Sequence, residues 1–439
     1  MPTVPLPPLS VAVLMSTVLV ASSRPAASAP ERKTQGRSKL VEDIAQTIEG
    51  KYHDPAQAKR IAEALRGAEA EGRLGSPRRP EELAGSLSTL LASFDPHFNV
   101  RYAPAKPGKE KEGPSPHDRD SYLRRARRAN FGFEKVTRLA GNVGYLRLRS
   151  FENAAMAGPT VAAAMAFLNH TDALIIDLRR NGGGDPGMVQ LLASYFFEDN
   201  ETHLNNLYWR PRDFTRQLWT LPYVPGERRP DVPLFILTSR ATGSAAEAFG
   251  YHLQALKRAT LIGTPTVGAA NPGDFFRVGD YLLFVSTGRA INPVTQSNWE
   301  GSGVQPDVEV PAHQALDEAL TRAWTLLRDK SGDKDARREL DWALEEVEAR
   351  RNPVETSEES LRRLVGVYGV NKISWTDGAL KFQRRARAAV EMIPLGQDRF
   401  MPRGQSDFRL VFERDGRGRA ERLHAQWSDG YVETSAPQN

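Results

Sequence analysis

The chain contains no cysteine among its 439 residues. It therefore cannot form a disulfide scaffold, a thiolate zinc site, an iron–sulfur cluster or a lipid-anchored N-terminal cysteine. A covalent mechanism would need serine, threonine, lysine or a carboxylate as its nucleophile. The mean hydropathy of -0.48 also excludes a protein with many membrane spans. Because no dense metal-ligand motif occurs, we expect neither a metal nor a cofactor.

Long hydrophobic runs are also missing. Residues 9–22 form an apolar run that is too short to span a bilayer comfortably, and small residues follow it up to Ala29. This pattern predicts a signal peptide over residues 1–29 and export to the periplasm or the extracellular space. A disordered N-terminal tail is the alternative. No second run of membrane length follows, so we expect no integral membrane span in the mature chain.

Neither sign of charge dominates. The chain has 59 basic and 54 acidic residues, a net charge of +5. Arginines occur in short runs, at 124–125, 127–128 and 384–385. Such runs are usually solvated faces, and no nucleic-acid-binding motif accompanies them, so we expect no nucleic-acid partner.

The sequence patterns divide the chain into four parts after residue 29. Apolar residues at helical spacing predict a helical bundle over 38–102. A linker rich in proline, glycine and charge follows at 103–119. Alternating strands and helices predict an α/β domain over 120–330. Residues 331–439 read as a charged helix followed by a small β-rich domain with Asp-Gly hairpin turns.

Ser244 is a candidate nucleophile. It lies where a buried strand, 234–238, is expected to give way to a helix over 245–256. At such a junction a serine can face a cleft, and the free N–H groups of the first helical turn can stabilise an oxyanion. Serine is also a favoured helix N-cap, and position alone favours that structural role.

The segment 181–184, Asn-Gly-Gly-Gly, also joins an expected strand to an expected helix. Glycines let the backbone approach a substrate closely, so this segment can supply an oxyanion donor. A tight turn is the structural alternative. A phosphate-binding loop fits poorly, because no Lys-Ser or Lys-Thr pair follows the glycines.

A serine nucleophile needs a base, and the chain has eight histidines. His97 lies in a turn with apolar flanks, where a histidine is usually structural. His252 lies two turns into the helix after Ser244 and is less able to reach it. Glu300 can orient a histidine or be an ordinary loop carboxylate. The residue types and their spacing thus permit a serine hydrolase without selecting one.

Four segments occur together in order, at residues 141–146, 176–184, 238–249 and 303–307. They read Gly-Asn-Val-Gly-Tyr-Leu, Ile-Asp-Leu-Arg with Asn-Gly-Gly-Gly, Thr-Ser with Ser-Ala-Ala-Glu-Ala-Phe, and Gly-Val-Gln-Pro-Asp. The set resembles the tail-specific, or C-terminal-processing, serine peptidase superfamily. It is most similar to the branch of interphotoreceptor retinoid-binding protein and the tricorn protease core. The resemblance covers roughly residues 38–328. It implies an α/β fold with a crotonase/ClpP-like core of β-β-α units.

The resemblance implies that Ser244 is the nucleophile, with the N–H groups of Ala245 and Gly183 forming the oxyanion hole. In lysine-dependent members the base follows a Thr-x-Gly stretch. Here residues 266–268 form that stretch, and Ala269 stands at the lysine position.

The tricorn-like branch instead uses histidine and glutamate with its serine. His97 and Glu300 fall at those places, while Pro96 replaces the serine that the tricorn pattern has beside its histidine. The expected catalytic group is therefore Ser244, His97 and Glu300.

Together these observations predict an exported serine peptidase that acts on polypeptides through an acyl-enzyme on Ser244. His97 would be the general base, and Glu300 would orient it. Because the lysine is absent, the alternative is a non-catalytic binding protein for an apolar ligand or a peptide on the same fold. An esterase is a third possibility, since the same acyl-enzyme chemistry serves esters. The oligomeric state stays open.

Overall fold

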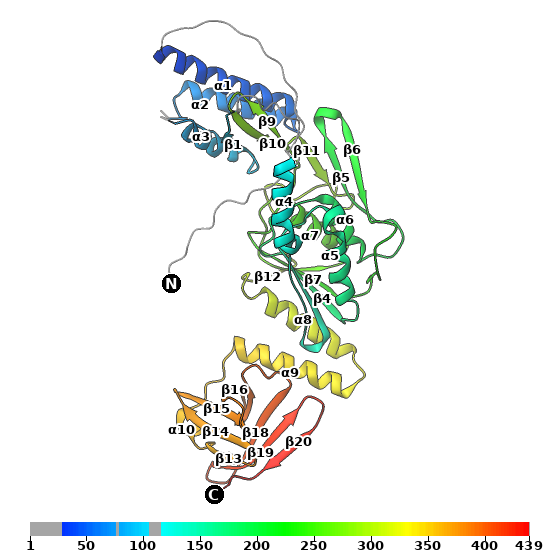
Figure 1. Ribbon diagram of the computed structural model, residues 1–439, viewed down its shortest axis with the longest axis vertical. Coiled ribbons are helices and arrows are strands. Elements are labelled where there is room, and N and C mark those ends of the chain that lie inside the picture. The colour runs from blue at the N-terminus through cyan, green and yellow to red at the C-terminus, as the bar shows by residue number, and fades with distance from the viewer. Residues whose placement is uncertain (1–28, 76–78, 105–115, 439) are drawn as a thin grey trace. The chain divides into compact units, whose positions relative to one another are not determined.

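The computed structural model describes residues 29–75, 79–104 and 116–438. These residues form a mixed α/β protein with a helical N-terminal region and a β-rich C-terminal region (Figure 1). The chain divides into two compact units, the first made of Met1–Val136, Leu146–Asn169 and Ile176–Ala312, the second of Thr137–Tyr145, His170–Ile175 and His313–Asn439. The predicted signal peptide lies outside the described residues except for Ala29, where the first helix begins.

The helical region predicted near the N-terminus is present. It consists of α1 (Ala29–Lys51), α2 (Pro55–Ala70) and α3 (Pro80–Ala92). Asp54 caps α2 by accepting hydrogen bonds from two backbone N–H groups of its first turn. None of the helices in the described residues combines the length and apolar character that crossing a membrane requires.

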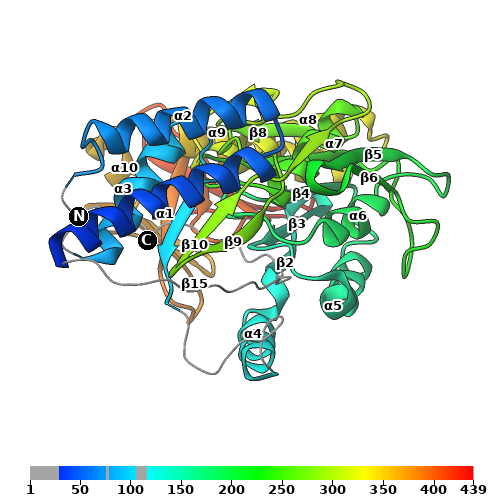
Figure 2. The ribbon, with the colours of Figure 1, turned by 90° about the horizontal axis from the view of Figure 1, so that it is seen from above.

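This helical region shares its core with residues that lie far away in the sequence. Strand β1 (Asn99–Tyr102) pairs antiparallel with β10 (Tyr281–Val285), which pairs with β9 (Asp274–Val278). Buried side chains of the three helices and of this small sheet form one hydrophobic cluster. Figure 2 shows α1 and α2 beside the β9–β10 pair. The turn between α3 and β1 is therefore held against the rest of the first unit by strand pairing.

Six strands form one sheet in the order β12-β8-β7-β4-β3-β2. Strands β4 and β7 are buried at every position, as their unbroken apolar sequences predict. The strands are β2 (Phe133–Leu139), β3 (Val143–Leu148), β4 (Ala173–Asp177), β7 (Leu234–Thr238), β8 (Thr260–Gly263) and β12 (Val308–Glu309), and the helices between them are α5 (Ala154–Phe167), α6 (Pro186–Ser194) and α7 (Ala245–Ala255).

A second small sheet was not predicted from the sequence. Strand β5 (His203–Trp209) pairs antiparallel with both β6 (Phe214–Trp219) and β11 (Gly288–Ile291). Strand β6 exposes four of its six residues, so it lacks the apolar run that marks β4 and β7.

The second unit ends in an antiparallel sheet of eight strands in sequential order. The predicted Asp-Gly turns join neighbouring strands of this sheet, and Asp377 and Gly378 both have positive φ, as a tight hairpin turn requires. Its helices are α8 (Ala315–Lys330), α9 (Lys334–Arg351) and α10 (Glu358–Arg362), and its strands are β13 (Gly366–Tyr368), β14 (Asn371–Thr376), β15 (Ala379–Arg384), β16 (Val390–Gly396), β17 (Arg399–Pro402), β18 (Phe408–Arg414), β19 (Ala420–Trp427) and β20 (Val432–Ser435).

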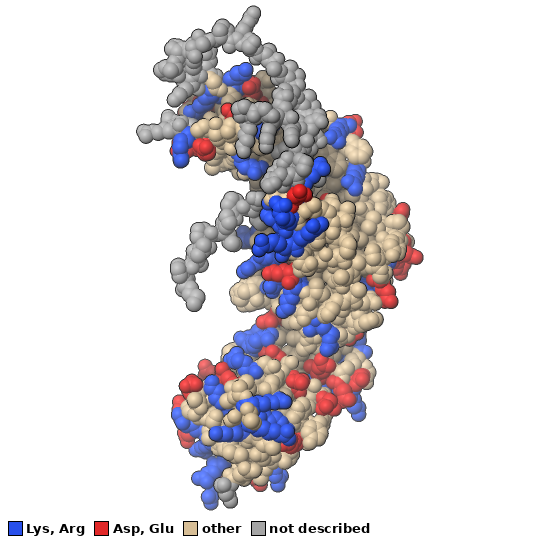
Figure 3. Space-filling model, in the orientation of Figure 1, with Lys and Arg blue, Asp and Glu red and all other residues tan. Residues whose placement is uncertain are grey.

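The predicted linker, 103–119, needs a correction at its end. Residues 105–115 lie outside the described residues, but α4 (Pro116–Arg128) begins inside the predicted linker. Proline suits the first position of a helix, where no N–H donor is needed, so its presence did not signal a loop. The arginine pairs at 124–125 and 127–128 are exposed on this helix. Figure 3 shows basic side chains gathered over it. The other predicted domain boundaries stay predictions.

Candidate active site

Ser244 lies between the end of β7 and the first residue of α7. Its backbone has φ 52° and ψ -119°, a conformation that residues with a side chain rarely adopt. Two hydrogen bonds fix the turn before it: Thr242 Oγ1 donates to Leu178 O, and Gly243 N–H donates to Asn181 O. The fold therefore holds the serine in a strained, partly exposed position, which is typical of a functional residue.

Gly183 lies directly against Ser244. A Cβ atom added to Gly183 would be 2.7 Å from Ser244 Cβ and 2.9 Å from Ala245 N, and the glycine has φ +110°. Only glycine fits here. Its N–H donates to Asn181 Oδ1 at 2.9 Å, so the predicted oxyanion donor already has a partner. The Ala245 N–H, at the first position of α7, belongs to the helical turn whose donors have no partner within the helix.

We expect Gly183→Ala to abolish activity, because the added methyl group would displace Ser244 or the start of α7. The unfavourable φ adds strain of about 1–2 kcal/mol. Gly158→Ala is the matched control, since the nearest atom to its added Cβ is 4.0 Å away, inside α5. Peptide turnover and chemical denaturation of both variants check this prediction. Full activity of Gly183→Ala would contradict the close approach described here.

Glu247 holds Ser244 from the first turn of α7. It accepts hydrogen bonds from the N–H groups of Ser244, at 2.7 Å, Gly268, at 2.6 Å, and Ala269, at 2.9 Å, and from the Thr266 hydroxyl. The side chain is only 1% exposed. Burial raises its pKa, against the opposing effect of these hydrogen bonds. Glu247 thus ties the serine to the segment that contains Gly268 and Ala269.

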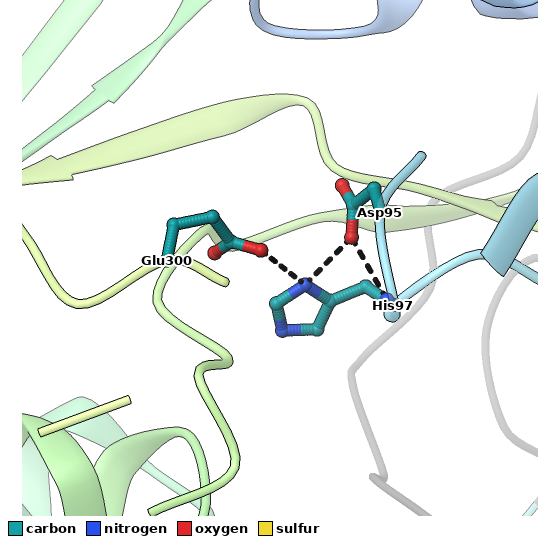
Figure 4. Close-up of side chains that lie close together, drawn as sticks. All are labelled: Asp95, His97 and Glu300. Atoms are coloured by element: carbon teal, nitrogen blue, oxygen red, sulfur yellow. Dashed lines mark hydrogen bonds and ion pairs between the residues drawn. The ribbon is translucent and has the colours of Figure 1, made fainter. Parts of the chain in front are cut away.

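His97 lies in the turn after α3, and its ring is contacted by two carboxylates, those of Asp95 and Glu300 (Figure 4). Its Nδ1 is 3.0 Å from Asp95 Oδ1 and 3.4 Å from Glu300 Oε1. Burial by itself would lower the pKa of His97, but hydrogen bonding to Asp95 and Glu300 and their negative charges raise it to about 10. The pKa of Asp95 is lowered, because burial is outweighed by its hydrogen bonds and by the His97 charge. Imidazolium and carboxylates therefore form an ion-pair cluster.

Glu300 is anchored through its second oxygen. Oε2 accepts hydrogen bonds from the N–H groups of Ala270 and Asn271, both at 2.8 Å. The short segment 266–271 thus donates to Glu247 at one end and to Glu300 at the other. The same backbone segment therefore supports Ser244, through Glu247, and His97, through Glu300.

The structure brings together two pairs of the predicted residues. Gly183 meets Ser244 with Ala245, and His97 meets Glu300. Within the described residues, no hydrogen bond joins Ser244 to His97. Catalytic hydrogen bonds are often long when no substrate is bound. The relay of Ser244, His97 and Glu300 therefore stays a prediction.

Two other histidines of the chain are accounted for. His252 is buried in α7, and burial lowers its pKa to about 3, so it stays neutral. The side chain of His117 lies outside the described residues.

The group around His97 also has the composition of a metal site. Ligand atoms of Asp95, His97 and Glu300 lie within 4.8 Å of one another. Both oxygens of Asp95 already accept hydrogen bonds, from the His97 N–H and from the Ser286 hydroxyl. A cation would have to displace this network, and the ion pair explains the geometry without one.

A strained serine between a buried strand and a helix, with a glycine loop against it, is an arrangement typical of serine hydrolases. Residues 142–310 match the profile of peptidase family S41. This match covers less than half of the chain, and it confirms the predicted resemblance to the tail-specific serine peptidase superfamily.

The chain is similar to curated proteins over part of its length. It is 26% identical over 200 residues to carboxyl-terminal-processing peptidase 1, chloroplastic, of Arabidopsis thaliana, covering 44% of this chain and 39% of that protein. It is 30% identical over 174 residues to the carboxyl-terminal-processing protease of Synechocystis sp., covering 39% of each. The matches thus span about two fifths of these relatives. Among solved structures, the photosystem II D1 C-terminal processing protease aligns with a TM-score of 0.41 at 15% identity, covering 63% of this chain and 93% of that chain.

Sequence reasoning did not single out Asp95 and Glu247. A signal for Glu247 was available, because a glutamate three residues after a helix-starting serine forms a capping box. Asp95 also had a local signal, since Asp two residues before a backbone N–H commonly accepts from it in a turn.

Proposed function

We propose that the chain is an exported serine peptidase that hydrolyses polypeptides through an acyl-enzyme on Ser244. The observation that carries the proposal is the strained Ser244 with Gly183 against its Cβ, inside the region that matches family S41. A crotonase/ClpP-like core, the division at residues 102, 119 and 330, and dependence on histidine rather than lysine are parts of the same proposal. The names of the carboxyl-terminal-processing relatives support polypeptide substrates.

The proposed reaction follows from the roles of these groups. Ser244 Oγ attacks the scissile carbonyl carbon while its proton passes to His97 Nε2. The carbonyl oxygen becomes an oxyanion, which accepts a hydrogen bond from the Ala245 N–H and, once released from Asn181, from the Gly183 N–H. His97 then donates its proton to the leaving amine. A water molecule, deprotonated by His97, hydrolyses the ester and restores Ser244.

Labelling with a fluorophosphonate tests this proposal, because the reagent reacts with activated serines. We expect wild type to be labelled, Ser244→Ala to be unlabelled and His97→Ala to be labelled far more slowly. Ser406→Ala, an exposed serine in the C-terminal sheet region, is the control and should label as wild type does. Equal labelling of all four proteins would refute the assignment of Ser244.

A non-catalytic binding protein for an apolar ligand or a peptide is the second candidate function. Two observations favour it: no hydrogen bond joins Ser244 to His97 in the described residues, and the Gly183 N–H is already engaged. Under this function, wild type would resist the fluorophosphonate yet bind peptides with the same affinity as Ser244→Ala. Loss of labelling confined to Ser244→Ala would exclude it.

A further inference from the structure

The Asp95 carboxylate is held in place by several hydrogen bonds, and it contacts the His97 ring. It lies two residues before His97, and its side chain is 2% exposed. Its Oδ1 accepts the His97 backbone N–H at 2.8 Å and lies 3.0 Å from the ring Nδ1. Its Oδ2 accepts the Ser286 hydroxyl at 2.7 Å. One carboxylate thus holds both the backbone and the ring of His97.

The pairing of Asp95 with His97 is local, because both residues lie in the same turn. Pro96 lies between the two residues and restricts the backbone, so less conformational freedom is lost when the ring is held. Ser286 follows β10, whose pairing with β1 joins the turn to the rest of the first unit. Asp95 thus supplies an acceptor for the ring from the same turn.

Glu300 is less well suited to hold the ring. Its Oε1 is 3.4 Å from Nδ1, farther than the 3.0 Å of Asp95 Oδ1, while Oε2 is engaged by the backbone. The Glu300 side chain is 22% exposed, against 2% for Asp95. A single Nδ1–H can make one strong hydrogen bond, and Asp95 offers the shorter one.

We propose that Asp95, and not Glu300, is the positioning residue that accepts the Nδ1–H of His97 and so leaves Nε2 as the atom that exchanges a proton with Ser244. Glu300 adds negative charge beside the ring and anchors the 266–271 segment. The part concerning Ser244 rests on the proposed function, whereas the pairing of Asp95 with Nδ1 does not.

The charged surroundings of His97 follow from this pairing. Asp95 and Glu300 face its Nδ1 from two different segments, and the charges of both carboxylates also act on Tyr52 and His53, which directly follow α1. Burial raises the pKa of Tyr52, and the Asp95 charge raises it further. Burial lowers the pKa of His53, opposed by Asp95 and Glu300. Two carboxylates therefore act on one imidazolium, and removing either should lower its pKa.

The test measures the His97 pKa directly, from the pH dependence of the exchange of its ring C2 proton for deuterium, detected by mass spectrometry of peptides. We expect Asp95→Asn to lower this pKa by about one to three units, and Glu300→Gln to lower it less. Ser286→Ala removes the contact with Oδ2 but keeps the charge, so His97 should keep its raised pKa. If Asp95→Asn does not fold, Asp95→Ser replaces it, since serine can still accept the His97 N–H without a charge.

An unchanged His97 pKa in Asp95→Asn, or a larger fall in Glu300→Gln, would overturn the proposal. The exchange measurement needs no catalysis, so it separates this inference from the proposed function. If wild type is never labelled by the fluorophosphonate but Asp95→Asn lowers the pKa, only the catalytic part fails. In an active protein, Asp95→Asn should lower the kcat reached at alkaline pH, where His97 is neutral in both proteins, with little change in KM. It should also move the rising limb of the pH profile of kcat/KM to lower pH.

Discussion

Replacement of Ser244 by alanine is expected to lower kcat for peptide hydrolysis by about a millionfold, leaving only the contribution of binding and the oxyanion donors. The loss is this large because no acyl-enzyme can form without the hydroxyl. Steady-state hydrolysis of a peptide substrate, followed by the appearance of new N-termini, measures it. Ser406→Ala should keep the wild-type rate. A Ser244→Ala loss of less than about tenfold would show that another group is the nucleophile.

A second substitution at the same position separates chemistry from strain. Ser244→Gly should be as inactive as Ser244→Ala, but it should unfold at a higher denaturant concentration. Glycine adopts positive φ without penalty, whereas alanine keeps the strain at φ 52°. We expect a difference of about 1 kcal/mol in the free energy of unfolding, after the greater entropy of the unfolded glycine chain is subtracted. Equal stability of the two variants would contradict the strain.

The second large effect concerns His97 and pH. Its pKa of about 10 means that the imidazole is protonated near neutral pH and cannot accept the Ser244 proton. We therefore expect kcat/KM to rise from pH 7 towards pH 10, where an ordinary histidine would already be neutral. His97→Gln should lose about 10²–10⁴-fold in kcat/KM and should lose this rising limb.

The exposed His170 provides the control, and His170→Gln should keep both the rate and the pH profile. Two results would contradict the account of the ion-pair cluster. One is a rising limb centred near the ordinary histidine pKa of 6.5 in wild type. The other is a rising limb that persists in His97→Gln.

Much of the fold could be predicted because its signals are local. The strand at 234–238 and the hairpin turn at 377–378 depend on short apolar runs and on positive φ, which neighbouring residues specify. The pairing of β1 with β10 could not be predicted, because it joins residues about 180 positions apart and β1 has only four residues. The helix at Pro116 was missed because proline in a charged segment indicates a loop as readily as a helix start.

The candidate site shows the same division. The position of Ser244 beside Gly183 follows from two strand–helix junctions of neighbouring strands, and the sequence order of the family motifs pointed to both. The contact between His97 and Glu300 joins a turn to a loop about 200 residues away, so this distance could not be obtained from spacing. The use of the Gly183 N–H by Asn181 was equally hidden, since the glycine pattern does not specify where its donors point.

The proposed reaction requires that Ser244 is the residue acylated. Mass spectrometry of peptides from the fluorophosphonate-treated wild-type protein tests it most directly, because it identifies the modified side chain. We predict one adduct, on the peptide that contains Ser244, with a rate of formation that rises above neutral pH. An adduct on another residue, or a protein that hydrolyses peptides without forming any adduct at Ser244, would contradict the account.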